Sequence, residues 1–254
     1  MIIIKRFAPY WSSLSILVLL VVGINQPLQW LYVSLGLVAI IVITITLMHQ
    51  PHWHLEYIGL GTALLILILS CFTFILILEQ DTIIYGLIAV TIAIYFLFVQ
   101  NIVLFLFVPK KYIPYSLEYI CTYSNVVASF YMYVSAFIFL VLGLGRLRYV
   151  LSIVCCATFI LVWQTFWIQK IAWSQARWYI MVISLIMAET IWAVHYWPVS
   201  FFVSGFLLTI ELYVLLNMSR YYLNQTLTSK LVLLYSVTSG TAVLILLLTA
   251  QWLL

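Results

Sequence analysis

Long apolar stretches separated by short polar breaks run along the whole chain. Nine stretches come close to the roughly 20 residues that an α-helix needs to cross the hydrocarbon core of a bilayer. They cover residues 8–24, 28–48, 57–78, 82–107, 115–144, 149–168, 178–197, 199–218 and 231–252. Because these stretches are continuous and do not alternate as β-barrel strands do, the pattern predicts an all-α, polytopic transmembrane helical bundle. Only Asn25-Gln26-Pro27 divides the first two stretches, so eight spans are the alternative count.

Prolines and tryptophans fall near the ends of the predicted spans. Proline lacks an amide donor and fits poorly inside a helix, and all six prolines lie at proposed helix ends: Pro9, Pro27, Pro51, Pro109, Pro114 and Pro198. Tryptophan collects at the membrane–water interface, which agrees with Trp11, Trp30, Trp53, Trp167, Trp178, Trp197 and Trp252. The connections between spans are short, so we expect residues 1–254 to form one integral membrane domain without a soluble domain.

The composition indicates a surface that faces lipid. Hydrophobic residues make up 67% of the 254 residues and charged residues 6%, whereas a soluble domain carries roughly 25% charged residues. So few charges cannot cover a surface that faces water. The net charge of +4 comes from Lys and Arg residues scattered in ones and twos, which does not indicate a nucleic-acid partner.

The basic residues predict the orientation of the chain. With the N-terminus in the cytoplasm, the outside segments hold only Arg146 and Arg148. The inside segments then hold eight basic residues: Lys5, Arg6, Lys110, Lys111, Lys170, Arg177, Arg220 and Lys230. Cytoplasmic segments of membrane proteins are enriched in Lys and Arg. The sequence therefore predicts the N-terminus inside and the C-terminus outside.

Two carboxyls interrupt the apolar seventh and eighth spans. A charged side chain at the bilayer centre costs about 2.5–3.5 kcal/mol on insertion scales, so Glu189 and Glu211 need a reason. The turn at Pro198 joins the two spans into a hairpin, which places both carboxyls at a similar depth near the midplane. In one interpretation each is protonated and hydrogen-bonds a neighbouring helix, which fixes the packing. In the other, the two carboxyls share a proton and carry protons or cations.

Helical spacing assigns further polar residues to faces. Glu211 shares a face with Ser200 and Ser204, so we expect it to point into the bundle. His195 is six residues from Glu189, about 120° around the helix, so we expect it at the outer interface, beside Tyr196 and Trp197, instead of paired with Glu189.

The fifth span carries a stripe of polar and small residues that includes Glu118, Cys121, Asn125 and Ser129. Glu118 is predicted in the first helical turn, where a negative charge complements the helix dipole. Asn125 lies deeper and is interpreted as an interhelical hydrogen-bonding residue. The alternative is that this stripe lines a cavity that Glu189 or Glu211 also faces.

Metal and cofactor sites are not predicted. His49, His52 and His54 lie in one short loop, but their spacing matches no metal motif, so they are interpreted as interfacial side chains. The four cysteines fall in or beside apolar runs and form no C-x-x-C pair, which is typical of buried free thiols.

The region from residue 178 to 252 resembles the C-terminal part of small, uncharacterised multi-span proteins of ultrasmall candidate-phylum bacteria. The resemblance is carried by Ala188-Glu189, Trp192, Trp197-Pro198, Arg220 and Thr249-Ala250-Gln251-Trp252. It implies a bacterial inner-membrane location and no particular activity.

The sequence leaves three hypotheses of function. It contains no serine–histidine arrangement, acidic metal motif or phosphate-binding glycine loop, which favours a non-catalytic membrane protein that is a subunit or scaffold of an assembly. Its partners are then the lipid bilayer and a protein or second copy, bound through small-residue faces such as Ser236, Ser239 and Gly240. The second hypothesis is a small-solute or proton-coupled transporter that uses Glu189 and Glu211. The third is a membrane enzyme for lipid-linked substrates, built on Glu118 and the three loop histidines.

Overall fold

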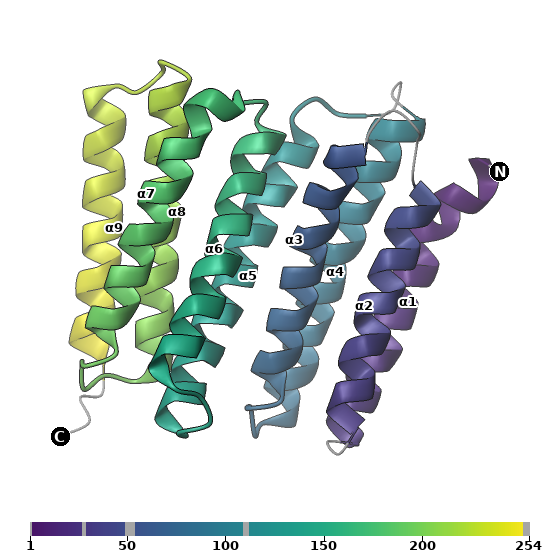
Figure 1. Cartoon of the computed structure of the whole chain (residues 1–254), viewed down its shortest axis with the longest axis horizontal. Helices are drawn as coiled ribbons and strands as arrows, with labels where there is room; N and C mark the ends of the chain where they lie inside the picture. The colour runs from purple at the N-terminus through teal and green to yellow at the C-terminus, as the bar shows by residue number, and fades with distance from the viewer. Residues whose placement is uncertain (1, 27–28, 49–53, 109–111, 251–254) are drawn as a thin grey trace. The chain divides into compact units, whose positions relative to one another are not determined.

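The computed structural model of the chain consists of helices joined by short turns (Figure 1). It describes residues 2–26, 29–48, 54–108 and 112–250. These residues form nine α-helices and no strand. The helices are α1 (Ile2–Asn25), α2 (Trp30–Met48), α3 (His54–Ile75), α4 (Asp81–Phe107), α5 (Ser116–Val141), α6 (Leu147–Ile168), α7 (Trp173–Val194), α8 (Phe201–Leu223) and α9 (Ser229–Thr249). Each helix corresponds to one predicted span, which confirms the all-α class and the nine segments.

Length and apolar composition make the chain a multi-pass membrane protein. Among the described residues, eight helices are long and apolar enough to cross a bilayer. In α3, the apolar part with described side chains is the shorter segment Gly59–Ile75. Helices suit this environment because every backbone polar group inside a bilayer must be satisfied within its own segment.

The prolines are at helix ends with one exception. Pro114 precedes α5 and Pro198 lies between α7 and α8, as predicted, whereas Pro27, Pro51 and Pro109 lie outside the described residues. The prediction for Pro9 is wrong, because α1 begins at Ile2 and contains it. The apolar sequence continues upstream of Pro9, and transmembrane helices tolerate the one missing backbone hydrogen bond. The same extension places Trp11 inside α1, not at its end.

The chain divides into two compact units, residues 1–128 and 129–254. The division falls within α5, and the prediction of a single membrane domain stays a prediction. In the first unit, α1 packs against α2 and α4, and α3 packs against the same two helices, so the four helices close a ring. Its core includes polar contacts between helices, such as the Cys71 thiol donating to the Thr91 hydroxyl at 3.3 Å.

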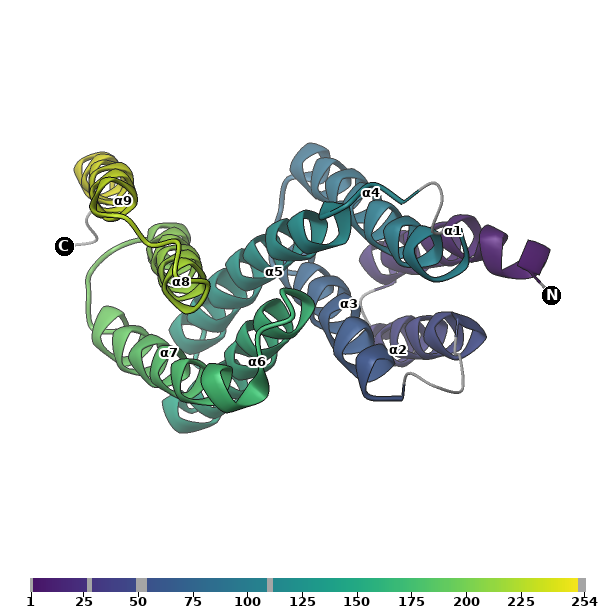
Figure 2. The ribbon, with the colours of Figure 1, turned by 90° about the horizontal axis from the view of Figure 1, so that it is seen from above.

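In the second unit, α7 packs against α6 and α8, and α9 packs against α8 (Figure 2). The α8 backbone also lies close to α5: a Cβ added at Gly205 would be 3.1 Å from the backbone nitrogen of Val134. By contrast, α9 contains no buried residue. The second unit is therefore well packed from α5 to α8 and open at α9.

Candidate functional site

Glu211 lies between two helices of the second unit. Its Oε1 atom is 3.0 Å from the Thr190 hydroxyl of α7, and the same hydroxyl is 3.0 Å from the Ile186 carbonyl. A threonine hydroxyl has one proton to donate. The Thr190 hydroxyl therefore shares its proton between two acceptors, the Ile186 carbonyl and the Glu211 carboxyl. Glu211 therefore points toward α7 and connects it to α8.

Two further helices bring polar groups near Glu211. The Tyr133 hydroxyl of α5 is 3.1 Å from the Thr158 hydroxyl of α6, and both side chains are fully or almost fully buried. Tyr133 also interacts electrostatically with Glu211. We call Glu211, Thr190, Tyr133 and Thr158 the Glu211 cluster. It includes one polar side chain from each of α5, α6, α7 and α8.

Glu189 is next to Thr190 in the chain and so lies at a depth similar to that of Glu211. Successive helix residues are about 100° apart around the axis, and Glu189 is exposed on the surface of α7. No contact between the two carboxyls is present among the described residues. The structure therefore brings Glu211 to Thr190, with Glu189 on another face of the same helix.

His195 lies at the C-terminal end of α7, as the C-cap residue. Its ring meets the Tyr196 ring edge-on, with centroids 5.2 Å apart. It follows Glu189 by more than a helical turn and lies beyond the last residue of the helix, Val194. This is the end of the span at which the sequence placed it, together with Tyr196 and Trp197.

Glu118 lies in the first turn of α5, as predicted. The Tyr112 hydroxyl donates to its Oε2 atom at 3.2 Å and accepts from the Leu117 backbone amide at 3.4 Å. Burial raises the pKa of the Tyr112 phenol above its ordinary value. Glu118 is thus tied to the turn before α5, in the first unit.

Asn125 is buried deeper in α5, with 1% of its surface exposed. Its amide nitrogen lies 3.6 Å from the Cys121 sulfur, one turn earlier in the same helix. Cys121 is also buried and has a free thiol. The contact joins two members of the polar stripe within α5.

The three histidines predicted at the interface lie at or beyond the edge of the described residues. His49 and His52 lie outside the described residues, and His54 begins α3 without a described side chain. Within the described part of the chain, no three His, Cys, Asp or Glu side chains form a group that could hold a metal ion.

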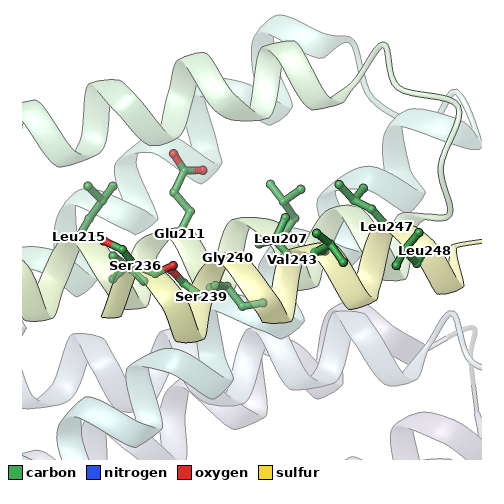
Figure 3. A pocket seen from close by; sticks show the side chains of 12 residues that line it. Leu207, Glu211, Leu215, Ser236, Ser239, Gly240, Val243, Leu247 and Leu248 are labelled. Atoms are coloured by element: carbon green, nitrogen blue, oxygen red, sulfur yellow. The ribbon is translucent and has the colours of Figure 1, made fainter. Parts of the chain in front are cut away.

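A groove of about 920 Å³ lies between α8 and α9. Its lining is mostly leucine, isoleucine and valine, and its polar residues are Glu211, Ser236 and Ser239. Figure 3 shows that the Glu211 side chain leaves α8 at this groove, with its carboxyl directed away from Ser236 and Ser239. The groove is therefore an apolar surface beside the Glu211 cluster, and not a second polar site.

Sequence reasoning missed three members of the Glu211 cluster and one further buried side chain. Thr190 follows Glu189 directly, and Tyr133 lies four residues after Ser129 of the α5 stripe. Tyrosine and threonine occur throughout the spans, so neither stands out. Gln164 in α6 is fully buried, and its amide has no partner within the described part of the chain. Gln164 is the one glutamine in the apolar stretch of residues 149–168, so the sequence alone could have singled it out as a buried polar residue.

Comparison with known proteins shows that the C-terminal half of the chain, which contains Glu211 and the α8–α9 groove, belongs to a described family. The model of the family DUF5656, described as a protein of unknown function, matches residues 118–249. The match covers just over half of the chain, from the first turn of α5 to the last residue of α9. It includes the Glu211 cluster and the α8–α9 groove, and it confirms the resemblance of the C-terminal part to an uncharacterised family. No curated protein and no solved structure matches the chain.

Proposed function

We propose that this chain, which belongs to the DUF5656 family of proteins of unknown function, is a non-catalytic subunit of a membrane-protein assembly in the bacterial inner membrane. The observation that carries the proposal is the open packing of α9. This helix belongs to the matched region, yet none of its residues is buried, while α7 and α8 beside it each bury seven.

The groove along α9 suits a transmembrane helix of another protein. Ser236, Ser239 and Gly240 line it, and small residues let helices approach closely in a bilayer. A Cβ added at Gly240 would meet no atom within 4 Å, so the small face is not filled by α8. From Ser236 to Leu248 the α9 wall extends about 18 Å at 1.5 Å per residue. A partner helix could pack there over several turns.

The test uses a photo-reactive amino acid placed on α9 in the native membrane. Val243 lines the groove, whereas Val237 is 54% exposed on α9 and does not line it. We expect a single cross-linked protein partner from position 243 and none from position 237. When the partner is purified, this chain should co-purify with it in a constant molar ratio.

A matched pair of glycine variants sharpens the test. Gly240→Leu fills the groove and should abolish the cross-link and the co-purification. Gly86→Leu places the same side chain in α4 at another site with no atom within 4 Å, and should preserve both. Cross-links to lipid alone, or only to a second copy of this chain, would rule out a subunit of a mixed assembly.

A second candidate function is proton-coupled or small-solute transport, and the Glu211 cluster favours it. Its carboxyl contacts the Thr190 hydroxyl of α7, and its Oε2 atom is buried with no hydrogen-bond partner among the described residues. Intramembrane carboxyls of this kind occur in proton relays.

If the protein is a transporter of this kind, uptake by proteoliposomes under a pH gradient should be lost in Glu211→Gln. It should be retained in Glu189→Gln, which changes an exposed carboxyl at similar depth. Uptake that is unaffected by Glu211→Gln would remove this candidate.

A further inference from the structure

A second cavity, of about 620 Å³, lies at one end of the second unit. The first turns of α7, the end of α8 and the turn between α8 and α9 form it. Its polar and aromatic lining is supplied by Ser174, Gln175, Trp178, Tyr179, Tyr222 and Gln225. Because it lies where spanning helices end, the cavity is at the depth of the lipid headgroups.

The lining suits a molecule that is partly polar and partly apolar. Tyr179 and Tyr222 approach each other across the helices, with ring centroids 6.0 Å apart. Such amphipathic rings favour the headgroup region of a bilayer. The side chains of Ser174, Gln175 and Gln225 provide hydroxyl and amide donors, and Leu223 and Leu227 provide an apolar wall.

Four basic residues lie at this end of the unit. Lys170 is in the turn before α7, Arg177 is in α7, Arg220 is in the last turn of α8 and Lys230 is in the first turn of α9. The Arg177 guanidinium lies 5.4 Å from the ring centre of Trp178, which lines the cavity. The four residues are scattered along the sequence, and only the fold collects them.

No acidic residue balances these charges at the same end. Residues 129–254 contain two carboxyl side chains, Glu189 and Glu211. Glu211 lies in the middle of α8 and Glu189 lies in α7 at a similar depth, so neither carboxyl is in the helix ends and turn that form the cavity. Within the second unit the end that holds the cavity is therefore positively charged, and basic residues near a membrane surface attract anionic lipid.

We propose that this cavity binds the headgroup of an anionic phospholipid. The phosphate accepts hydrogen bonds from the amide and hydroxyl donors of the lining and is attracted by the surrounding basic residues, while Leu223 and Leu227 contact the first methylenes. A lipid, and not a free phosphate compound, fits the aromatic and apolar part of the lining and the position of the cavity at the membrane surface. This site is separate from the α8–α9 groove and does not depend on the proposed role as a subunit.

The test compares lipids in nanodiscs that carry the full chain. Native mass spectrometry would count bound lipid as phosphatidylglycerol replaces phosphatidylcholine. We expect wild type to retain phosphatidylglycerol in preference to phosphatidylcholine. The double variant Arg177→Gln, Arg220→Gln should bind it roughly thirtyfold more weakly, as expected from the loss of two surface charges. The matched control is Arg146→Gln, Arg148→Gln, which removes two basic residues at the opposite end of α6 and should change the binding little.

A second variant tests the same site in case the double arginine variant does not fold. Gln225→Glu adds one negative charge in an exposed turn of the cavity and should also weaken retention of phosphatidylglycerol, with an unchanged elution volume in size-exclusion chromatography. Equal effects of the two arginine pairs would overturn the proposal, because they would show general surface attraction. Equal retention of both lipids by wild type would overturn it as well. Displacement of the lipid by millimolar glycerol 3-phosphate would instead indicate a site for free phosphate compounds.

Discussion

The Thr190 hydroxyl of α7 and the Glu211 carboxyl of α8 lie 3.0 Å apart and connect two helices that the chain joins only by a short turn. Thr190 takes the position across from Glu211 that the sequence suggested for Glu189. The carboxyl thus has a neutral hydroxyl partner in place of a second acid. This favours a packing role for Glu211, and it leaves proton transfer as the alternative that transport measurements address.

The Thr190–Glu211 contact predicts a measurable coupling energy. Glu211→Leu and Thr190→Val should each lower the free energy of unfolding by about 0.5–1.5 kcal/mol, the range for interhelical hydrogen bonds in membranes. Glu211→Gln should have little effect, because the amide oxygen can accept from the Thr190 hydroxyl as the carboxyl oxygen does. Unfolding in detergent by titration with sodium dodecyl sulfate gives these values. A double-mutant cycle without coupling between the two positions would show that the contact does not contribute to stability.

Glu189→Gln should leave the fold and its stability unchanged. The side chain is exposed and contacts no described partner on the neighbouring helices, so exchanging its carboxyl for an amide removes no interhelical contact. The same detergent titration measures the effect, with Glu211→Leu as the destabilised reference. Loss of folded protein in Glu189→Gln would mean that Glu189 fixes the packing of the bundle.

Gly205→Ala should destabilise the second unit by about 1–3 kcal/mol, the usual cost of overfilling a packed interior. An added Cβ would lie 3.1 Å from the backbone nitrogen of Val134 and 3.2 Å from its Cα, and backbone atoms cannot turn aside as a side chain can. The control is Gly86→Ala in α4, where a Cβ meets nothing within 4 Å. Because alanine favours the helix over glycine, Gly86→Ala should be neutral or slightly stabilising. Equal stability of the two variants would argue against close contact between α5 and α8.

The predicted orientation can be measured by labelling single cysteines in intact cells. In a background without the four native cysteines, Gln225→Cys should be protected from a membrane-impermeant thiol reagent and should react in inverted vesicles. Gly145→Cys, at the opposite end of the second unit, should show the reverse pattern. The physical reason is the excess of Lys and Arg in the segments assigned to the cytoplasm. Labelling of residue 225 in intact cells would invert the topology and would place the proposed lipid site in the outer leaflet.

The amino-acid sequence determined the membrane class and the division of the chain into helices. Both depend on local requirements: a bilayer demands about 20 apolar residues per crossing, and each crossing must satisfy its own backbone hydrogen bonds. For this reason every predicted span has a helix in the structure, including the first two, which only three polar or turn residues separate. The limit of local reasoning is visible at Pro9, where the helix continues through a residue that was expected to begin it.

Only the tertiary structure decided which residues meet. Glu211 faces Thr190, and four basic residues from separate segments lie at the same end of the second unit as one cavity. In water, an apolar stripe identifies the buried face of a helix. In a bilayer, lipid tails are as apolar as leucine, so the faces that meet lipid and the faces that meet other helices have similar sequences. The rotation of each helix, and hence the partner of each polar side chain, is set by packing between helices far apart in the chain.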